Sequence, residues 1–353
     1  MKEVISAVDE WLASGESAIA LATVITTWGS APRKVGAKMA FTAEGRMIAG
    51  SVSGGCVEGA VIEAGGEVLA TGRPQLLHFA VADETAWGVG LGCGGEIEVF
   101  VEGLDTDAYA TAREQVIAHQ PVTLITIIHG SDEQIGRHGV VADGAVSGML
   151  GTAWDERIVE LARQTRHSAR VELSDGVELF IDFVRPSPAL VIVGGAHVAI
   201  ALAEFAKILG YRTVVVDPRR AFGSQSRFPD VDQLLSMWPD KAFEEIPLRS
   251  DMAVVTLTHD PKIDDPALRA ALASDVFYIG ALGSRKTQAR RLERLSAMGF
   301  TEEQLGRIHA PVGLPIGADN PEEIALAIMA EVVAVYRQAG QPHNGSSRTT
   351  IKS

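Results

Sequence analysis

The sequence predicts an α/β protein, with an N-terminal mixed α/β domain followed by a C-terminal Rossmann-like domain built on a parallel sheet. Two observations predict this fold class. Short apolar strands alternate with helically spaced segments along most of the chain. In addition, the apolar strand Ala189–Val193 is followed by a glycine turn, a helix to Leu209 and a second strand ending in Asp217. This order of elements is typical of a dinucleotide-binding unit.

Length and charge limit the function classes. The chain has 353 residues, 46% of them hydrophobic, which is ample for a packed core and too long for one typical domain. Its net charge is −14, and no basic run is longer than a pair, which argues against a nucleic-acid surface.

Apolar patterning and cysteine usage predict a cytoplasmic protein. Met1–Trp11 has the pattern of an amphipathic helix and not of a secretory signal. No apolar run approaches about 18 residues, so we expect no membrane span. The two cysteines form no disulfide framework, which is consistent with a reducing compartment.

The paired prolines of Arg185-Pro186-Ser187-Pro188 restrict the backbone and indicate a linker. The expected domains are therefore residues 1–184 and 189–340. The polar stretch 341–353 is predicted to be a disordered tail.

The first domain is expected to begin with strands and one helix around a glycine-rich loop. The predicted strands are Ala18–Thr27, Ala37–Phe41, Met47–Ala49, Leu76–Val81 and Glu96–Glu102, and the predicted helix is Val57–Leu69. Its middle part shows no catalytic constellation and is expected to complete the same sheet. The elements predicted there are the helices Asp107–His119 and Glu156–Arg163 and the strands Val122–Ile128 and Glu178–Val184.

The segment Gly50–Gly59 places Cys56 in a glycine- and serine-rich loop between a strand and a helix. Glycines can turn successive N–H groups into one concavity, and a helix N-terminus adds partial positive charge. Such a loop favours a phosphate or a thiolate. The alternative is a tight turn in which Cys56 is buried as a small apolar residue.

A second glycine-rich loop, Gly88–Gly95, contains Cys93. A segment with five glycines in eight residues is costly to order, so we expect something beyond its own contacts to order it. Two such loops in one domain favour a ligand site.

The second domain opens with Gly194-Gly195-Ala196-His197-Val198-Ala199. Asp217 follows Gly194 at the distance from which an acid can accept a hydrogen bond from a ribose hydroxyl. Ala196 takes the place of the second glycine of G-x-G-x-x-G, which normally lets the backbone approach a pyrophosphate. A Rossmann-like domain without a bound dinucleotide is the alternative interpretation.

Further candidate residues follow the later strands. Ligands of open parallel sheets lie beyond the carboxyl ends of the strands. Besides His197 and Asp217, the sequence places His259, Gly280 and His309 at such ends. Gly283, Ser284 and Arg285 precede a helix and suit a phosphate. The closing helix is expected over Pro321–Arg337.

Taken together, these motifs resemble the XdhC/CoxI family over nearly the whole chain. They are Ser-Val-Ser-Gly-Gly-Cys-Val-Glu at 51–58, Gly-Cys-Gly-Gly at 92–95, Gly-Gly-Ala-His-Val at 194–198, Thr-His-Asp at 258–260, Tyr-Ile-Gly-Ala-Leu-Gly-Ser-Arg at 278–285 and His-Ala-Pro-Val-Gly-Leu-Pro-Ile-Gly-Ala at 309–318. Ala196 departs from the pattern, because the family usually has glycine there.

The resemblance implies an accessory protein for a molybdenum hydroxylase such as xanthine dehydrogenase, an insertion factor more than a catalyst. Such a protein binds the molybdenum cofactor (molybdopterin or its dinucleotide form), supports its sulfuration with a cysteine desulfurase and delivers it to the target enzyme. Cys56 would ligate molybdenum or carry sulfur as a persulfide.

The candidate cofactor-binding residues are Ser51, Ser53, Gly54, Gly55, Cys56, Glu58, Gly92, Cys93, Gly94, Gly194, Gly195, Ala196, His197, Asp217, His259, Gly283, Ser284, Arg285 and His309. Cys56 is the candidate metal ligand, and no residue is assigned a catalytic role. A homodimer is a further expectation.

Two other functions compete with this one. The dinucleotide turn also fits an NAD(P)-dependent oxidoreductase, although the sequence offers no evident acid and base pair for hydride transfer. A redox-sensing or scaffold protein that binds a nucleotide without turnover is the third possibility.

Overall fold

The computed structural model describes residues 1–29, 31, 33–80, 95–148, 155–165, 167–173, 176–339 and 349–350. Two compact units are present. Unit 1 runs to Pro186 and also contains Thr349 and Thr350, and unit 2 begins at Ser187. Apart from these two threonines, the predicted tail from 341 onward lies outside the described residues.

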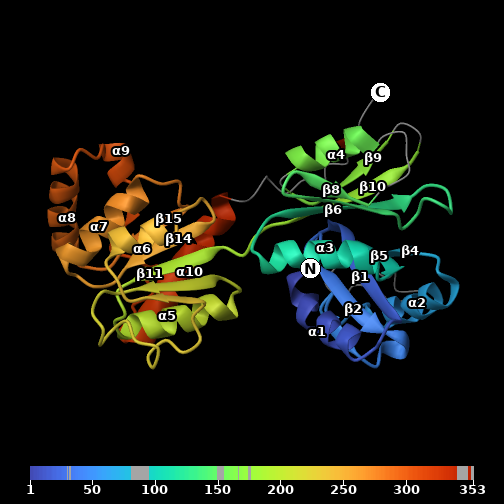
Figure 1. Ribbon diagram of the computed structural model, residues 1–353, viewed down its shortest axis with the longest axis horizontal. Helices are drawn as coiled ribbons and strands as arrows, with labels where there is room; N and C mark the ends of the chain where they lie inside the picture. The colour runs from blue at the N-terminus through green and yellow to red at the C-terminus, as the bar shows by residue number, and fades with distance from the viewer. Residues whose placement is uncertain are drawn as a thin grey trace. The chain divides into compact units, whose positions relative to one another are not determined.

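Unit 1 contains two sheets (Figure 1). The first is antiparallel, in the order β3-β2-β1-β5-β4. Its strands are β1 (Ile19–Trp28), β2 (Lys38–Thr42), β3 (Ile48–Gly50), β4 (Gln75–Phe79) and β5 (Glu96–Gly103). A short 3₁₀ turn, η1 (Ala43–Gly45), joins β2 to the segment before β3.

The second sheet has the order β17-β9-β10-β6-β7-β8 and is antiparallel except for the pair β17 and β9. Its strands are β6 (Val122–His129), β7 (His138–Ala142), β8 (Ala145–Ser147), β9 (Ala169–Glu172), β10 (Glu178–Val184) and β17 (Thr349–Thr350). The expectation that the middle of the chain completes the first sheet is therefore wrong. Both sheets have an apolar face, and Ile25 and Phe100 of the first pack against Ile128 and Phe180 of the second.

In the described part of unit 1, four helices cover these sheets. They are α1 (Lys2–Ala13), α2 (Glu58–Thr71), α3 (Thr106–Ile117) and α4 (Asp155–Gln164). Apolar residues of α1 and α3 share a core with strands of both sheets. The buried valines of α2 pack on the other face of the first sheet, and α4 covers the second sheet (Figure 1).

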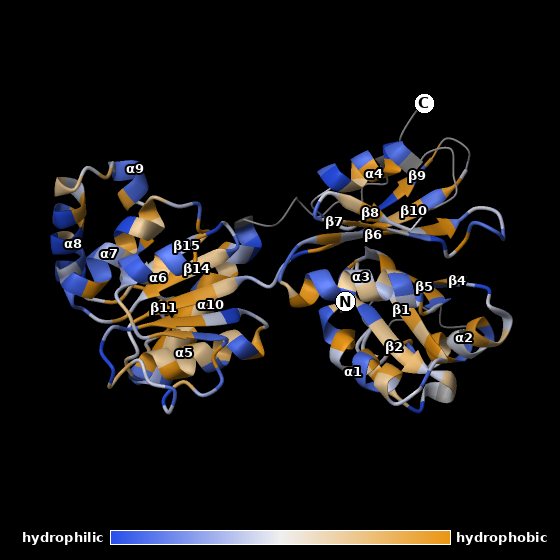
Figure 2. Ribbon diagram, in the orientation of Figure 1, coloured by the Kyte–Doolittle hydropathy of each residue, from blue (hydrophilic) through white to orange (hydrophobic). Residues whose placement is uncertain are grey.

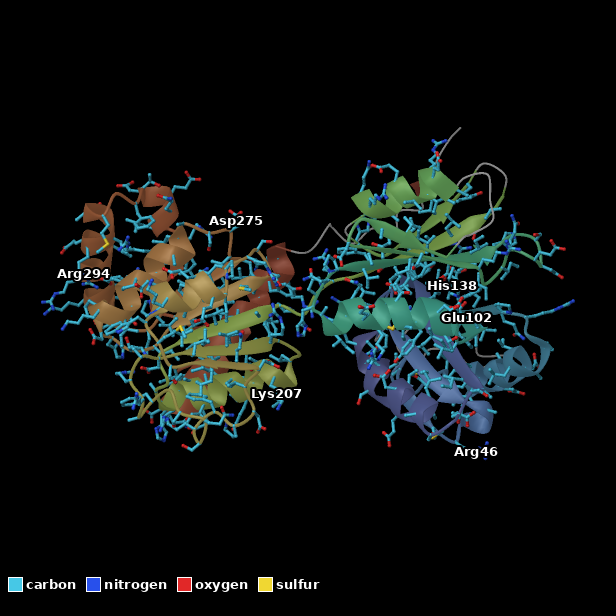
Figure 3. The ribbon with its side chains drawn as sticks, viewed as in Figure 1. Arg46, Glu102, His138, Lys207, Asp275 and Arg294 are labelled. Carbon is cyan, nitrogen blue, oxygen red and sulfur yellow. The ribbon has the colours of Figure 1, made fainter. Side chains whose placement is uncertain are left out.

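A small cavity of about 30 Å³ lies between the two sheets of unit 1. Two ion pairs line it. Lys38 Nζ is 3.0 Å from Asp182 Oδ2, and His138 Nε2 is 3.1 Å from Glu102 Oε2. Figure 3 labels Glu102 and His138, which come from β5 and β7. A cavity lined by charged groups and of this size can hold an ordered water, which would satisfy their remaining hydrogen-bonding capacity.

Unit 2 contains a parallel sheet in the order β13-β12-β11-β14-β15-β16. Numbered from its own first strand, this is the order 3-2-1-4-5-6 of a Rossmann fold, so the predicted fold class is confirmed. The strands are β11 (Ala189–Val193), β12 (Arg212–Val216), β13 (Gln233–Leu235), β14 (Met252–Thr256), β15 (Tyr278–Ala281) and β16 (Ile308–His309).

Helices cover both faces of this sheet, which is why β11 and β14 are apolar without alternation (Figure 2). One face packs on α5 and α10, and the other on α6, α7 and α8. The helices are α5 (His197–Ile208), α6 (Pro239–Glu245), α7 (Pro261–Leu272), α8 (Arg285–Ala297), α9 (Glu302–Leu305) and α10 (Pro321–Ala339). Among the helices described, none combines the length and the apolar character that crossing a membrane requires.

Candidate functional site

The Cys56 loop joins β3 to α2 and is anchored at two points. The side chains of Val52 and Val57 are fully buried in the core between α2 and the first sheet. Between them, Gly54 and Gly55 have φ values of +81° and +117°, which residues with a Cβ rarely adopt. The tip therefore turns outward, and Cys56 is exposed. This excludes the alternative of a buried cysteine.

The Glu58 carboxylate, from the first residue of α2, lies in the concavity of this loop. Its Oε1 accepts hydrogen bonds from the N–H groups of Ser53 (2.9 Å) and Gly54 (3.0 Å). Its Oε2 accepts one from the N–H of Gly55 at 2.9 Å. The hydroxyls of Ser51 and Ser53 donate to the same carboxylate.

These hydrogen bonds have an electrostatic consequence. Partial burial alone would raise the pKa of Glu58, but the hydroxyls of Ser53 and Ser51 and the Ser53 N–H outweigh it and lower the pKa to about 2. Glu58 is therefore ionised at neutral pH, and the loop holds an anion that belongs to the protein itself.

The loop predicted from the sequence is thus present, but its N–H groups are already used. Every backbone N–H from 51 to 57 has a hydrogen-bond acceptor, supplied by Lys38 O, by Ser51 and Ser53 hydroxyls and by Glu58. A phosphate could reach these donors only by displacing Glu58. The sequence signal for this contact is an acidic residue at the first helical position after a loop rich in donors.

Arg33 supports the same loop from outside. Its Nε donates to Ser51 O at 3.1 Å, and its guanidinium forms an ion pair with Glu3 of α1. The loop is therefore connected to both α1 and α2.

The glycine turn of unit 2 also holds a carboxylate of the chain. The N–H of Gly195 donates to Asp217 Oδ2 at 2.8 Å. Arg219 binds both oxygens of Asp217, with Nη2 at 2.7 Å from Oδ2 and Nε at 2.9 Å from Oδ1. Burial raises the pKa of Asp217, but the hydrogen bonds from Arg219 and Gly195 outweigh it and lower this pKa.

Close packing surrounds this turn. A Cβ on Gly195 would lie 2.3 Å from Phe222 O, and a Cβ on Gly194, whose φ is +106°, would lie 2.3 Å from the Thr258 methyl. The Arg219 guanidinium lies 4.3 Å from the Phe222 ring centroid. The segment after β12 therefore packs directly against Gly195.

The other predicted residues of unit 2 lie at the carboxyl edge of the sheet. Ala196 is the N-cap of α5, and the exposed His197 begins that helix. His259 is exposed in the left-handed region, with φ +62°. Gly283 precedes Ser284, whose side chain caps α8 by accepting from the Thr287 N–H at 3.2 Å.

His309 belongs to a cluster that the sequence did not reveal. Its Nδ1 lies 3.2 Å from Glu331 Oε1, and its ring stacks on Tyr278 with centroids 4.6 Å apart. Glu331 also accepts from the Tyr278 hydroxyl and from the Gly313 N–H. Glu331 lies in α10, 22 residues from His309, and no local motif connects them.

Some predicted residues fall outside the described ranges. Gly92, Cys93 and Gly94 belong to 81–94, which is not among the described residues. Within the described ranges, no group of three or more His, Cys, Asp or Glu side chains could hold a metal ion.

Two family models match the chain. One, described as the XdhC Rossmann domain, matches residues 190–332. The other, described as the XdhC and CoxI family, matches residues 11–80, a range that includes the Cys56 loop.

Similar proteins match nearly the full length. A Bacillus subtilis protein described as a probable subunit of xanthine dehydrogenase is 31% identical over 337 residues, covering 94% of this chain and 96% of the relative. The Escherichia coli "Molybdenum cofactor insertion chaperone PaoD" is 29% identical, covering 92% and 86%. A crystal structure described as a xanthine dehydrogenase from Bacillus halodurans superposes with a TM-score of 0.78 at 27% identity, covering 96% and 97%.

Proposed function

Because this chain belongs to the XdhC and CoxI family, we propose that it is an accessory protein that binds the molybdenum cofactor and delivers it to a molybdenum hydroxylase such as xanthine dehydrogenase. The near full-length similarity to a molybdenum cofactor insertion chaperone supports this function. The proposal includes support of cofactor sulfuration, with a cysteine desulfurase as the sulfur donor.

The observation that carries the proposal is the exposed thiol of Cys56 on a preorganised loop. The loop's N–H groups are bound within the protein, so the thiol is the group that the loop offers to a ligand. Thiolates are suitable soft ligands for molybdenum and can also carry sulfur as a persulfide. Both roles of Cys56 are part of the proposal.

The geometry also bears on the phosphate end of the cofactor. The Cys56 loop has no unbonded backbone N–H from 51 to 57, so we assign the phosphate or nucleotide to unit 2. Ser284 and Arg285 are exposed at the start of α8, where the helix dipole and the guanidinium favour an anion.

An NAD(P)-dependent oxidoreductase is less well supported. The Gly195 N–H and both oxygens of Asp217 already have partners within the protein. A dinucleotide would have to replace these hydrogen bonds before it could use the same groups.

The test is to purify the full chain without oxygen from cells that make molybdopterin, and to analyse what is bound. We expect a pterin, detected by fluorescence after oxidation, and activation of the apo form of a molybdenum hydroxylase. A stoichiometric nicotinamide nucleotide without pterin would favour the oxidoreductase instead.

The role of Cys56 is tested in the same assay with Cys56→Ala. Loss of a metal ligand is expected to reduce pterin retention and target activation by on the order of tenfold or more. Cys93→Ala, measured in parallel, determines whether the effect is specific to Cys56. Unchanged retention and activation in Cys56→Ala would refute the assignment to this thiol.

A further inference from the structure

Glu58 is the residue on which the hydrogen bonds of the Cys56 loop converge. We propose that Glu58 is a positioning residue, whose carboxylate fixes the loop 51–57 so that the Cys56 thiol is presented at its exposed tip. The use made of that thiol rests on the proposed function, whereas the positioning itself does not.

One carboxylate collects most of the donors of this loop. Oε1 accepts from the N–H groups of Val52, Ser53 and Gly54 and from the Ser51 hydroxyl, and Oε2 accepts from the N–H groups of Gly55 and Val57 and from the Ser53 hydroxyl. Hydrogen bonds to a charged acceptor are the strong ones, and several share a single carboxylate here.

Ser53 connects Glu58 to Cys56. A serine hydroxyl has one proton to donate and two lone pairs that accept. Ser53 donates its proton to Glu58, and its Oγ accepts from the N–H groups of Cys56 and Val57, both at 3.0 Å. The carboxylate thus sets the orientation of the hydroxyl that holds the backbone of Cys56.

The tip of the loop needs such an anchor. Gly54 and Gly55 are exposed, and glycine loses much conformational freedom on ordering. The buried Val52 and Val57 fix the ends of the loop but not its tip. The Glu58 carboxylate lies within hydrogen-bond reach of the tip, which supplies the missing constraint.

The chemistry of the acceptor distinguishes this role from packing. Glutamine has nearly the shape of glutamate, but one of its two terminal groups is an NH₂ donor, which would face the donors around Oε1 or Oε2. Glu58→Gln therefore preserves the side-chain volume but replaces one of the two carboxylate acceptors with a donor. Glu63→Gln, an exposed position of the same helix, is the matched control.

The experiment measures amide hydrogen exchange of residues 51–57 in the full-length protein at neutral pH. In the unmodified chain, the N–H groups of Gly54, Gly55 and Cys56 should be protected although they lie at an exposed tip. Glu58→Gln should accelerate their exchange by roughly tenfold to a hundredfold, as expected for loss of hydrogen bonds to a charged group. Glu63→Gln should leave it unchanged.

Two further variants separate the contributions of Ser53 and Glu58. Ser53→Ala should accelerate exchange at Cys56 and Val57 more than at Gly54 and Gly55, which keep Glu58 as their acceptor. Glu58→Ala should lose protection most at Gly55, whose N–H donates to Glu58 and to no serine hydroxyl, and added formate, a small carboxylate, should restore it. A residue that acts only by packing would not be replaced by formate.

The outcomes distinguish this proposal from the proposed function. If exchange in Glu58→Gln matches that in Glu63→Gln, or if formate has no effect on Glu58→Ala, the positioning role is wrong. If Glu58→Gln loses protection and cofactor retention falls with it by about tenfold, both proposals are supported. If protection is lost while Cys56→Ala retains the cofactor, Glu58 positions the loop and the proposed use of Cys56 fails.

Discussion

Two glycine turns in the described part of the molecule, one in each unit, bind a carboxylate of the protein in different ways. Several backbone N–H groups of the unit 1 turn donate to Glu58, and one N–H of the unit 2 turn, that of Gly195, donates to Asp217. Glu58 follows its loop directly, and its partners are backbone N–H groups and serine hydroxyls. Asp217 lies 22 residues from Gly195, and most of its hydrogen bonds come from Arg219.

The difference lies in what remains accessible. The tip of the Cys56 loop is exposed, so its carboxylate orders a surface that displays a thiol. Asp217 is completely buried, and Phe222 packs against Gly195. We conclude that the unit 1 carboxylate organises an exposed loop, whereas the unit 2 carboxylate holds a buried and closely packed turn.

The largest effect is expected at Asp217, because it is buried and has a charged partner. Asp217→Ala leaves the Arg219 guanidinium and the Gly195 N–H without their acceptor. We expect the free energy of unfolding of unit 2 to fall by about 2–4 kcal/mol. Chemical denaturation measures it, with the exposed Asp230→Ala as control. A change below about 0.5 kcal/mol would show that the Asp217 contacts do not hold this turn.

A second prediction compares the packing around Gly195 with the packing around a glycine at the start of α2. Gly195→Ala places a Cβ 2.3 Å from Phe222 O, so the segment after β12 must move, at a cost of about 1–3 kcal/mol. At Gly59, in the first turn of α2, a Cβ would meet nothing within 4 Å. Gly59→Ala is expected to be neutral or to stabilise by up to about 1 kcal/mol. Thermal unfolding of both variants checks the contrast, and equal effects would contradict it.

Local patterns predicted much of the fold. The strand Glu178–Val184 was predicted with its observed bounds, because a short apolar run bounded by turn residues is a local signal. The parallel sheet of unit 2 followed from the order strand, glycine turn, helix and strand. Strand pairing in unit 1 did not follow, because β1 pairs with β5 and β6 with β10 across intervening helices.

Of the candidate site, the sequence predicts only the hydrogen-bond donors and not their acceptors. Glycine and serine composition identified the loops that present N–H groups, and their positions before helices are confirmed. The sequence does not reveal the acceptors, because the Asp217 carboxylate comes within hydrogen-bond distance of Gly195 only when the β-α-β unit has folded. The Glu331 contact with His309 depends likewise on α10 packing beside the sheet.

The smallest expected effect is a shift in the acid titration of Glu58. This titration measures directly how strongly the loop donors stabilise the Glu58 carboxylate. An unperturbed glutamate titrates near pH 4.3, and the Ser53 and Ser51 hydrogen bonds lower the pKa of Glu58 to about 2. Since the folded-state pKa is lowered, the stabilisation that Glu58 contributes is fully present above about pH 4.3 and is lost as the pH falls towards 2. NMR of the side-chain carboxyl carbon follows this titration directly. In Ser53→Ala, the loss of one donor should raise the midpoint, while Ser226→Ala, at an exposed serine of unit 2, should not move it. A midpoint near 4.3 in the unmodified chain would mean that the loop donors do not stabilise the Glu58 anion. The comparison with Asp217, as two carboxylates stabilised by their hydrogen-bond donors, would then fail.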